Sequence, residues 1–144
     1  MTTTRTVRHG AVDLHTIAEG AGPVLLCVHG WPELAYSWRD QVSHFAARGW
    51  RVVALDVRGY GQSSKPEAVE AYTLRELAGD VAAVAAAWSE DPVVLLGHDW
   101  GAPIVYATTL LHPERVRAVA GLSVPFASPS ELAFPDLAAQ RYEG

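Results

Sequence analysis

The sequence has little of several features that mark special classes of protein. Cys27 is the only cysteine among 144 residues, which excludes an intrachain disulfide framework. No apolar run approaches the roughly 18 residues of a membrane-spanning helix, so we predict no membrane partner. Eleven basic against 16 acidic residues give a formal charge of −5, which argues against a surface that binds nucleic acid.

The chain does have enough apolar material for a folded core. Apolar residues make up 49% and charged residues 19%, which excludes a disordered chain, and the length suits one ordinary domain. Arg5 and Arg8 stand near the N-terminus with no apolar stretch behind them, so we expect no signal peptide. The lone cysteine fits a reducing compartment, and we predict a cytoplasmic protein.

Segments of strand character alternate with segments of helical character. Residues 4–19 are rich in β-branched side chains and broken by Gly10, which predicts a hairpin. The run 24–28 has no polar alternation and is typical of a strand buried on both faces. Further strands are predicted over 51–57, 93–96 and 116–122, with helices over 37–48, behind a capping box at 73–76, and over 100–111, where the sequence is apolar nearly all round.

This alternation predicts crossover connections, and therefore a mainly parallel sheet flanked by helices. In such sheets, ligands bind at the carboxyl ends of the strands. The loops that follow Val28, Val57, Leu96 and Leu122 are therefore where we expect the chemistry.

The first unusual loop is Gly97-His98-Asp99-Trp100-Gly101, between a predicted strand and a predicted buried helix. A sharp strand-to-helix turn exposes its central side chain above the sheet and requires small residues two positions to either side. Gly97 and Gly101 meet this requirement, and the central residue is Asp99. An Asp here could simply cap the helix, but the flanking glycines favour a nucleophile.

The second unusual loop is His29-Gly30-Trp31-Pro32, directly after the first buried strand. A nucleophile in such a turn needs backbone donors for a developing oxyanion. We expect these to be the N–H of Trp100 and the N–H of Trp31, in a loop that Pro32 would stiffen. We interpret His29 and Gly30 as structural, with the histidine buried and bonded to the loop backbone.

The loop over 56–64 carries two glycines after a strand, as a dinucleotide-binding fingerprint does. The third glycine position is Ser64, and Pro66 stands where the helix should begin, so the match fails. We interpret this loop as structural, tied by Asp56 and Arg58. The sequence therefore predicts no cofactor and no metal.

Five segments occur in an order that resembles the epoxide hydrolases of the α/β-hydrolase fold. They are 29–33, 36–39, 56–64, 97–101 and 122–125. The resemblance covers most of the chain, from the first buried strand to Pro125. It implies an α/β-hydrolase fold truncated after about the sixth strand, with 1–127 as the N-terminal part of the core and 128–144 as the start of a lid or a disordered tail.

The resemblance also implies a mechanism. By position, Asp99 would attack an epoxide carbon and form an alkyl ester, which water would hydrolyse to a diol. The N–H groups of Trp31 and Trp100 would stabilise the oxyanion of the second step. The family's histidine base, its acidic partner and its lid tyrosines match no residue of this chain by position. Aromatic walls without a nearby Arg or Lys imply a small apolar substrate.

Several alternatives remain open. A haloalkane dehalogenase would use Asp99 on an alkyl halide with Trp100 as halide donor, but the resemblance to that group implies Asn at Trp31. A fluoroacetate-type dehalogenase would have Arg at position 100, and a serine esterase would need Ser at position 99. The half-complete site also fits a truncated product, part of a longer sequence or an inactive remnant. An open sheet edge would then allow self-association or binding of a partner.

Overall fold

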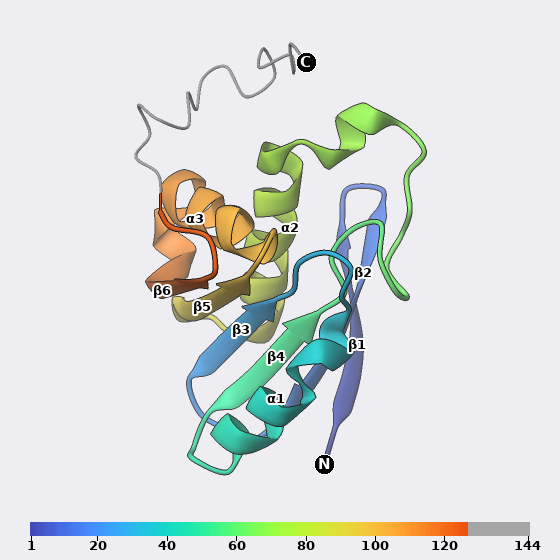
Figure 1. Ribbon diagram of the computed structural model, residues 1–144. Helices are drawn as coiled ribbons and strands as arrows, with labels where there is room; N and C mark the ends of the chain where they lie inside the picture. The colour runs from blue at the N-terminus through green and yellow to red at the C-terminus, as the bar shows by residue number, and fades with distance from the viewer. Residues whose placement is uncertain (127–144) are drawn as a thin grey trace.

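The computed structural model describes residues 1–126 and contains a six-stranded sheet flanked by helices (Figure 1). The segment 128–144, expected to begin a lid or tail, lies outside the described residues. The strands are β1 (Thr3–His9), β2 (Val12–Glu19), β3 (Val24–Val28), β4 (Arg51–Leu55), β5 (Val93–His98) and β6 (Val116–Leu122). The helices are α1 (Arg39–Ala46), α2 (Leu74–Trp88) and α3 (Gly101–Leu111), with 3-10 turns η1 (Ala35–Trp38), η2 (Val69–Tyr72) and η3 (Pro113–Arg115).

The predicted hairpin and the mainly parallel sheet are both confirmed. The strand order is β1-β2-β4-β3-β5-β6. The hairpin β1–β2 is antiparallel and joins β4 in antiparallel pairing, whereas β4, β3, β5 and β6 run parallel to one another. The carboxyl ends of these four parallel strands therefore lie along one edge, where the unusual loops meet.

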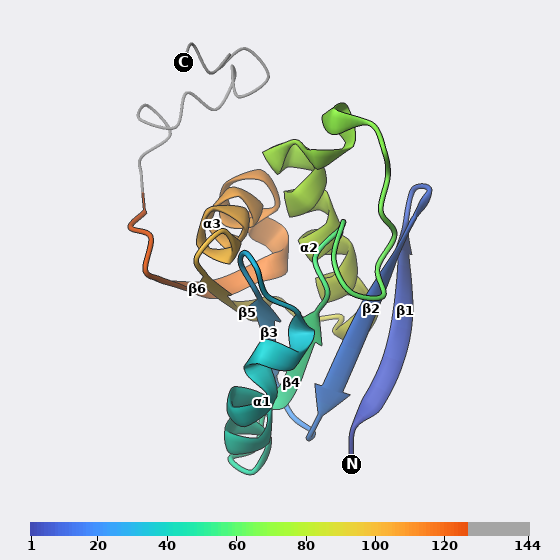
Figure 2. The same cartoon turned by 45° about the vertical axis from the view of Figure 1, so that its right-hand side comes forward.

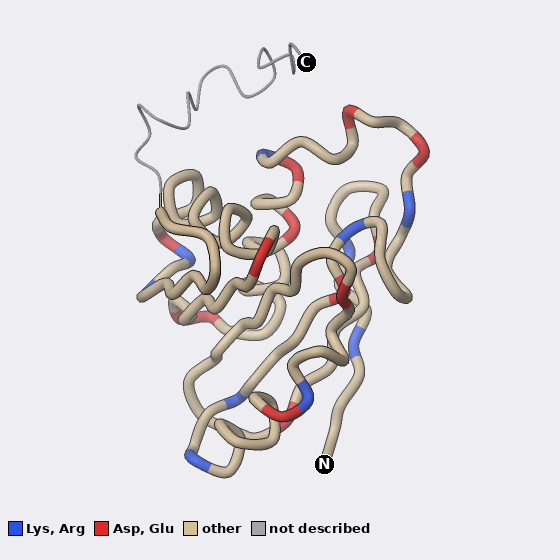
Figure 3. Tube along the Cα trace, viewed as in Figure 1, with Lys and Arg blue, Asp and Glu red and all other residues tan. Residues whose placement is uncertain are grey.

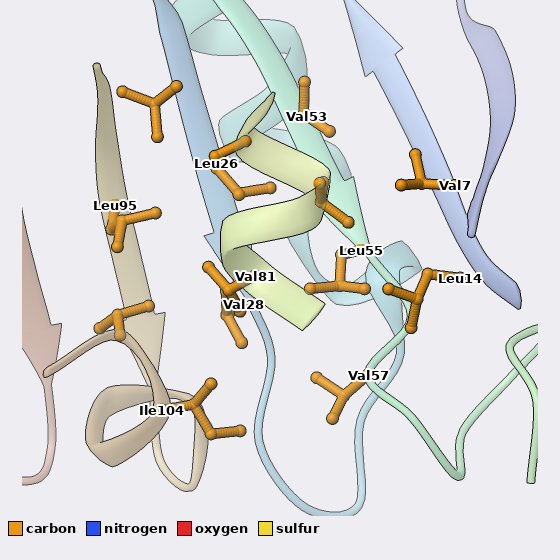
Figure 4. Packing of buried hydrophobic residues seen from close by; sticks show 14 of the residues in the cluster. Val7, Leu14, Leu26, Val28, Val53, Leu55, Val57, Val81, Leu95 and Ile104 are labelled. Atoms are coloured by element: carbon orange, nitrogen blue, oxygen red, sulfur yellow. The ribbon is translucent and has the colours of Figure 1, made fainter. Parts of the chain in front are cut away.

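The helices cover the two faces of the sheet unequally, with α1 on one face and α2 and α3 on the other (Figures 1 and 2). Alternate residues of β3 pack against the helices on opposite faces of the sheet, which is why this strand lacks polar alternation. Leu25 and Cys27 pack in the cluster of α1, while Leu26 and Val28 pack in the cluster of α2 and α3. Figure 4 shows this second cluster, with Val81 of α2 among the strand side chains.

Strand β5 differs from the expected fully buried run. Val93 and Leu95 are buried, but Val94 and Leu96 on the other face are half-buried. The reason is that α1 packs over β4 and β2, whereas the helix contacts of β5 come from α3 on the opposite face. The strand also runs to His98, two residues beyond the expected end, so it delivers its last residue directly to the turn.

The start of α2 keeps one half of the predicted capping box. The Thr73 hydroxyl oxygen accepts a hydrogen bond from the Glu76 backbone N–H at 3.3 Å. The Glu76 carboxylate lies 3.6 Å from a guanidinium nitrogen of Arg58. The first turn of α2 is thereby joined to the loop after β4.

Along the described part of the trace, positions of Lys and Arg are interspersed with positions of Asp and Glu (Figure 3). Of the helices in residues 1–126, none has the length and apolar character needed to cross a bilayer.

Candidate active site

Asp99 occupies the turn between β5 and α3 with a left-handed backbone, φ 55°. Its N–H donates to the Leu122 carbonyl at the end of β6 at 3.2 Å, and its carbonyl accepts from the Ala102 N–H. A Cβ on Gly97 would lie 2.4 Å from the Gly101 carbonyl oxygen, and one on Gly101 would lie 2.1 Å from the Val28 carbonyl oxygen. The turn therefore accepts only glycine at both flanking positions.

The Asp99 carboxylate contacts the loop after β3. Its Oδ2 accepts a hydrogen bond from the Trp31 backbone N–H at 2.9 Å. The backbone N–H groups of Trp31 and then Trp100 hold the pKa of the Asp99 carboxyl below its usual value, and the charge of His98 adds to this effect. The carboxylate is therefore ionised at neutral pH without help from a base.

Gly30 makes this contact possible. A Cβ on Gly30 would stand 2.4 Å from the Asp99 Cβ and 2.5 Å from its Oδ2. The loop turns sharply behind it, with a cis bond between Trp31 and Pro32 and a hydrogen bond from the Glu33 N–H to the Gly30 carbonyl. The backbone of the loop after β3 therefore packs directly against the Asp99 carboxylate.

The mouth of the site is aromatic. The side chains of Trp31 and Trp100, whose backbone N–H groups both face Asp99, are each 63% exposed. Large apolar groups exposed together in this way mark a surface that binds something apolar.

His29 lies buried beneath the site and uses both ring nitrogens on the backbone. Nδ1 donates to the Gly30 carbonyl at 2.8 Å, and Nε2 accepts from the Val57 N–H at 2.9 Å. Burial lowers the pKa of His29, so the ring is neutral. The histidine therefore links the loop after β3 to the loop after β4 and has no nitrogen left for proton transfer.

His98, the residue before Asp99, has a partner that the sequence did not predict. Its Nδ1 lies 2.9 Å from Oε1 of Glu33. His98 belongs to the turn after β5, and Glu33 directly follows the loop after β3. Their pairing depends on how β3 and β5 align, which spacing along the chain does not indicate.

Asp56 and Arg58 tie the loop over 56–64 to its surroundings, as predicted. Asp56 accepts hydrogen bonds from the Ala35 N–H at 2.9 Å and the Gln62 N–H at 3.0 Å. Arg58 donates to both carboxylate oxygens of Asp80 in α2, at 2.8 and 2.6 Å. In residues 1–126, no three His, Cys, Asp or Glu side chains gather as a metal site requires.

A pocket of about 470 Å³ opens beside Asp99. It lies between the loops after β3 and β4 and the first turns of α2 and α3, and most of its lining is apolar. Sequence reasoning missed this pocket because its walls come from four separate segments, each of which looks like ordinary core or loop.

Comparison with known proteins gives one consistent result. A family model described as alpha/beta hydrolase fold matches residues 23–141. Epoxide hydrolase B of Mycobacterium tuberculosis (strain ATCC 25618 / H37Rv) is 43% identical over 126 residues, which cover 85% of this chain and 35% of that protein. Epoxide hydrolase A of the same strain is 46% identical over 125 residues, covering 85% and 39%.

Solved structures agree with these relatives. An epoxide hydrolase from Vigna radiata superposes with a TM-score of 0.84 at 42% identity, covering 88% of this chain and 41% of that one. An epoxide hydrolase from an endophytic Streptomyces gives 0.85 at 44% identity, covering 88% and 38%. The chain thus spans about two fifths or less of the length of these relatives.

Proposed function

Since this chain belongs to the α/β hydrolase fold family, we propose that its protein opens an apolar epoxide to a diol through an ester on Asp99. The observation that carries the proposal is the hydrogen bond that the Trp31 N–H donates to the Asp99 carboxylate in the turn after β5. The similarity to proteins named epoxide hydrolase supports the same reaction. The proposal concerns the activity of the whole protein, because the chain covers about two fifths or less of the length of these relatives.

In the first step, the ionised Asp99 carboxylate acts as the nucleophile. One Asp99 oxygen attacks an epoxide carbon, the ring C–O bond breaks, and the ring oxygen takes a proton from a general acid or from water. Within residues 1–126 we assign no such acid. A serine at this position would need a base to remove its proton, whereas a carboxylate with a lowered pKa needs none. The product is an alkyl ester of Asp99.

The second step regenerates the enzyme. Water attacks the carbonyl carbon of the ester, and the resulting oxyanion lies at the N–H groups of Trp31 and Trp100. The bond from this carbon to the alkyl oxygen then breaks, the diol leaves, and Asp99 keeps one oxygen from the water. Within residues 1–126 we assign no base for this water, because His29 is bonded on both nitrogens and His98 pairs with Glu33.

The origin of the transferred oxygen tests this reaction. In a single turnover of styrene oxide by the complete protein in H₂¹⁸O, the label should enter the Asp99 peptide and not the diol. Asp99→Asn should form no diol while it keeps the fold, because Asn has the same shape and tolerates a left-handed backbone. Label in the first-turnover diol would show that water attacks the epoxide directly and would overturn the ester.

Halide release tests the dehalogenase alternative. Bromide set free from 1-bromohexane at a rate that exceeds epoxide opening, and lost in Asp99→Asn, would assign the same nucleophile to alkyl halides.

A further inference from the structure

We propose that Tyr106 of α3 is a positioning residue for Asp99 and acts on it through the end of β6. Its side chain contacts the chain before and after Leu122, whose carbonyl accepts the backbone N–H of Asp99. The inference rests on the proposed function, because the exact place of Asp99 matters for the reaction only if its carboxylate is the nucleophile. Tyr106 itself does not line the pocket beside Asp99.

The main chain of Asp99 depends on β6. Asp99 has a left-handed backbone, which a residue other than glycine keeps only where its surroundings hold it. The Leu122 carbonyl belongs to these surroundings, because it accepts the Asp99 N–H at 3.2 Å. The side chain of Asp99 in turn accepts the Trp31 N–H at 2.9 Å. A shift of the Leu122 carbonyl therefore moves Asp99 relative to the donor that its carboxylate contacts.

The Leu122 carbonyl lies at the very end of the strand. Leu122 is the last residue of β6, and it lies opposite His98 in the last pair of the register with β5. Ser123 then turns the chain with a left-handed backbone, φ 73°. Pairing within the sheet therefore holds this carbonyl from one direction along the chain, and support from the other direction comes from outside the sheet.

Tyr106 gives this support. Helix α3 packs against β6 (Figures 1 and 2). The Tyr106 hydroxyl donates to the Val124 carbonyl at 3.0 Å, just after the turn at Ser123. The same side chain lies so close to Gly121 that a Cβ there would overlap its hydroxyl oxygen. Leu122 and Ser123 are thus held between two contacts of one side chain.

The neighbours of Tyr106 fix its side chain in this place. Gly121 does not have a positive φ, and the three atoms nearest to a Cβ there all belong to Tyr106, so the tyrosine excludes a larger residue. The ring of Phe126 packs edge-on against the ring of Tyr106, with centroids 5.3 Å apart. Tyr106 is itself buried. Its hydroxyl is therefore a fixed donor for the chain after β6.

The hydroxyl does more than packing requires. A phenylalanine would bury the same ring, whereas only the hydroxyl fixes the chain next to the carbonyl that holds Asp99. Small displacements of a reacting group are costly, so loss of this fixed point should slow the attack of the carboxylate on the epoxide. Binding of the substrate should not change, because Tyr106 lies outside the lining of the pocket.

The test compares two variants of α3 in the complete protein, in single turnovers of styrene oxide at a temperature where circular dichroism shows both variants folded. Tyr106→Phe removes only the hydroxyl. It should lower the saturating rate of ester formation by about 10–10²-fold and leave the concentration for half of that rate unchanged. Thr108→Val is the control, because it removes a hydroxyl that donates within the same helix, to the Ile104 carbonyl at 2.8 Å. It should change neither quantity.

Gly121→Ala reaches the same contact from β6. Its methyl group displaces the Tyr106 hydroxyl and should also slow ester formation. Because both substitutions act on one contact, their losses should not multiply in the double variant. Two results would overturn the inference: losses that multiply, or ester formation in Tyr106→Phe that is as fast as in Thr108→Val.

Failure of the proposed function looks different, because then the wild type opens no epoxide either. In that case, amide hydrogen exchange followed by NMR decides whether Tyr106 positions Asp99. The N–H groups of Asp99 and Trp31 should exchange faster in Tyr106→Phe than in the wild type and in Thr108→Val, since each donates one of the hydrogen bonds that place Asp99. Equal exchange in the two variants refutes the positioning role.

Discussion

Gly30 and Asp99 pack so closely that one methyl group on Gly30 would overlap the aspartate side chain, 2.4 Å from its Cβ. Gly30 does not have a positive φ, so its backbone does not itself demand glycine. The requirement comes from the Asp99 side chain and, at 2.8 Å, from the carbonyl oxygen of His98 before it. Substitution at this position therefore tests the turn that holds the nucleophile candidate.

We expect Gly30→Ala to lower kcat for epoxide opening by about 10²–10³-fold, because the clash moves the Trp31 N–H away from Asp99 Oδ2. The measurement is steady-state kinetics of the complete protein, with circular dichroism to check the fold. Gly10→Ala is the control, since nothing lies within 4 Å of a Cβ there. It should cost about 1 kcal/mol through its positive φ and leave kcat unchanged. Equal kinetic losses in both variants would contradict the contact.

The lowered pKa of Asp99 predicts how stability depends on pH. Because hydrogen bonds from Trp31 and Trp100 favour the ionised form in the folded state, Asp99 stabilises the fold above its unfolded pKa of about 3.9. This contribution is lost as the pH falls through the lower folded value. Urea unfolding should therefore show wild type more stable than Asp99→Asn at pH 7, with a difference that shrinks below pH 4. A difference that grows in acid would contradict the assignment.

His29 predicts a second pH effect in a different window. Burial lowers its pKa in the folded state, so the unfolded chain binds a proton first as the pH falls through about 6.5. The His29 contribution to stability should be fully present above pH 6.5 and decline below it. His29→Ala should remove this dependence and cost about 1–3 kcal/mol for each of the two orphaned backbone groups. His44→Ala, at an exposed position on α1, should change neither.

The pair of Arg58 and Asp80 predicts a large effect on stability. Both side chains are buried, and Asp80→Asn removes the nearer, buried counter-charge of Arg58 and leaves only the exposed carboxylate of Glu76, so it should cost about 3–5 kcal/mol in the free energy of unfolding. Asp13→Asn breaks the exposed pair with Arg8 and should cost less than about 1 kcal/mol. Chemical denaturation of the two variants side by side is the measurement. Similar losses would show that burial of Arg58 does not matter.

Local patterns predicted the sheet and the loops well, because each depends on neighbours in sequence. The uninterrupted apolar run of β3 reflects burial on both faces, and Thr73 begins α2 as its N-cap. The two glycines around Asp99 predicted the turn, since their spacing alone makes it possible. The catalytic role of Asp99 and the donor roles of Trp31 and Trp100 stay predictions.

Features that depend on packing between distant segments could not be read in advance. The half-buried face of β5 depends on where α1 lies, and the sequence of β5 does not indicate the position of that helix. The pocket needs Tyr60, Leu77 and Ile104 from three segments to face one space. The contact of His98 with Glu33 likewise depends on how two strands are aligned.

The backbone hydrogen bond from Asp99 to Leu122 means that the five residues of the turn are not a transferable unit. A designer who grafts 97–101 onto another strand and helix would move the carboxylate but leave behind the carbonyl that holds its main chain. The graft would have to include the end of β6, including Ser123, which has a left-handed backbone of its own, φ 73°. Two neighbouring strands, and not one short motif, are the smallest scaffold on which this aspartate could be rebuilt.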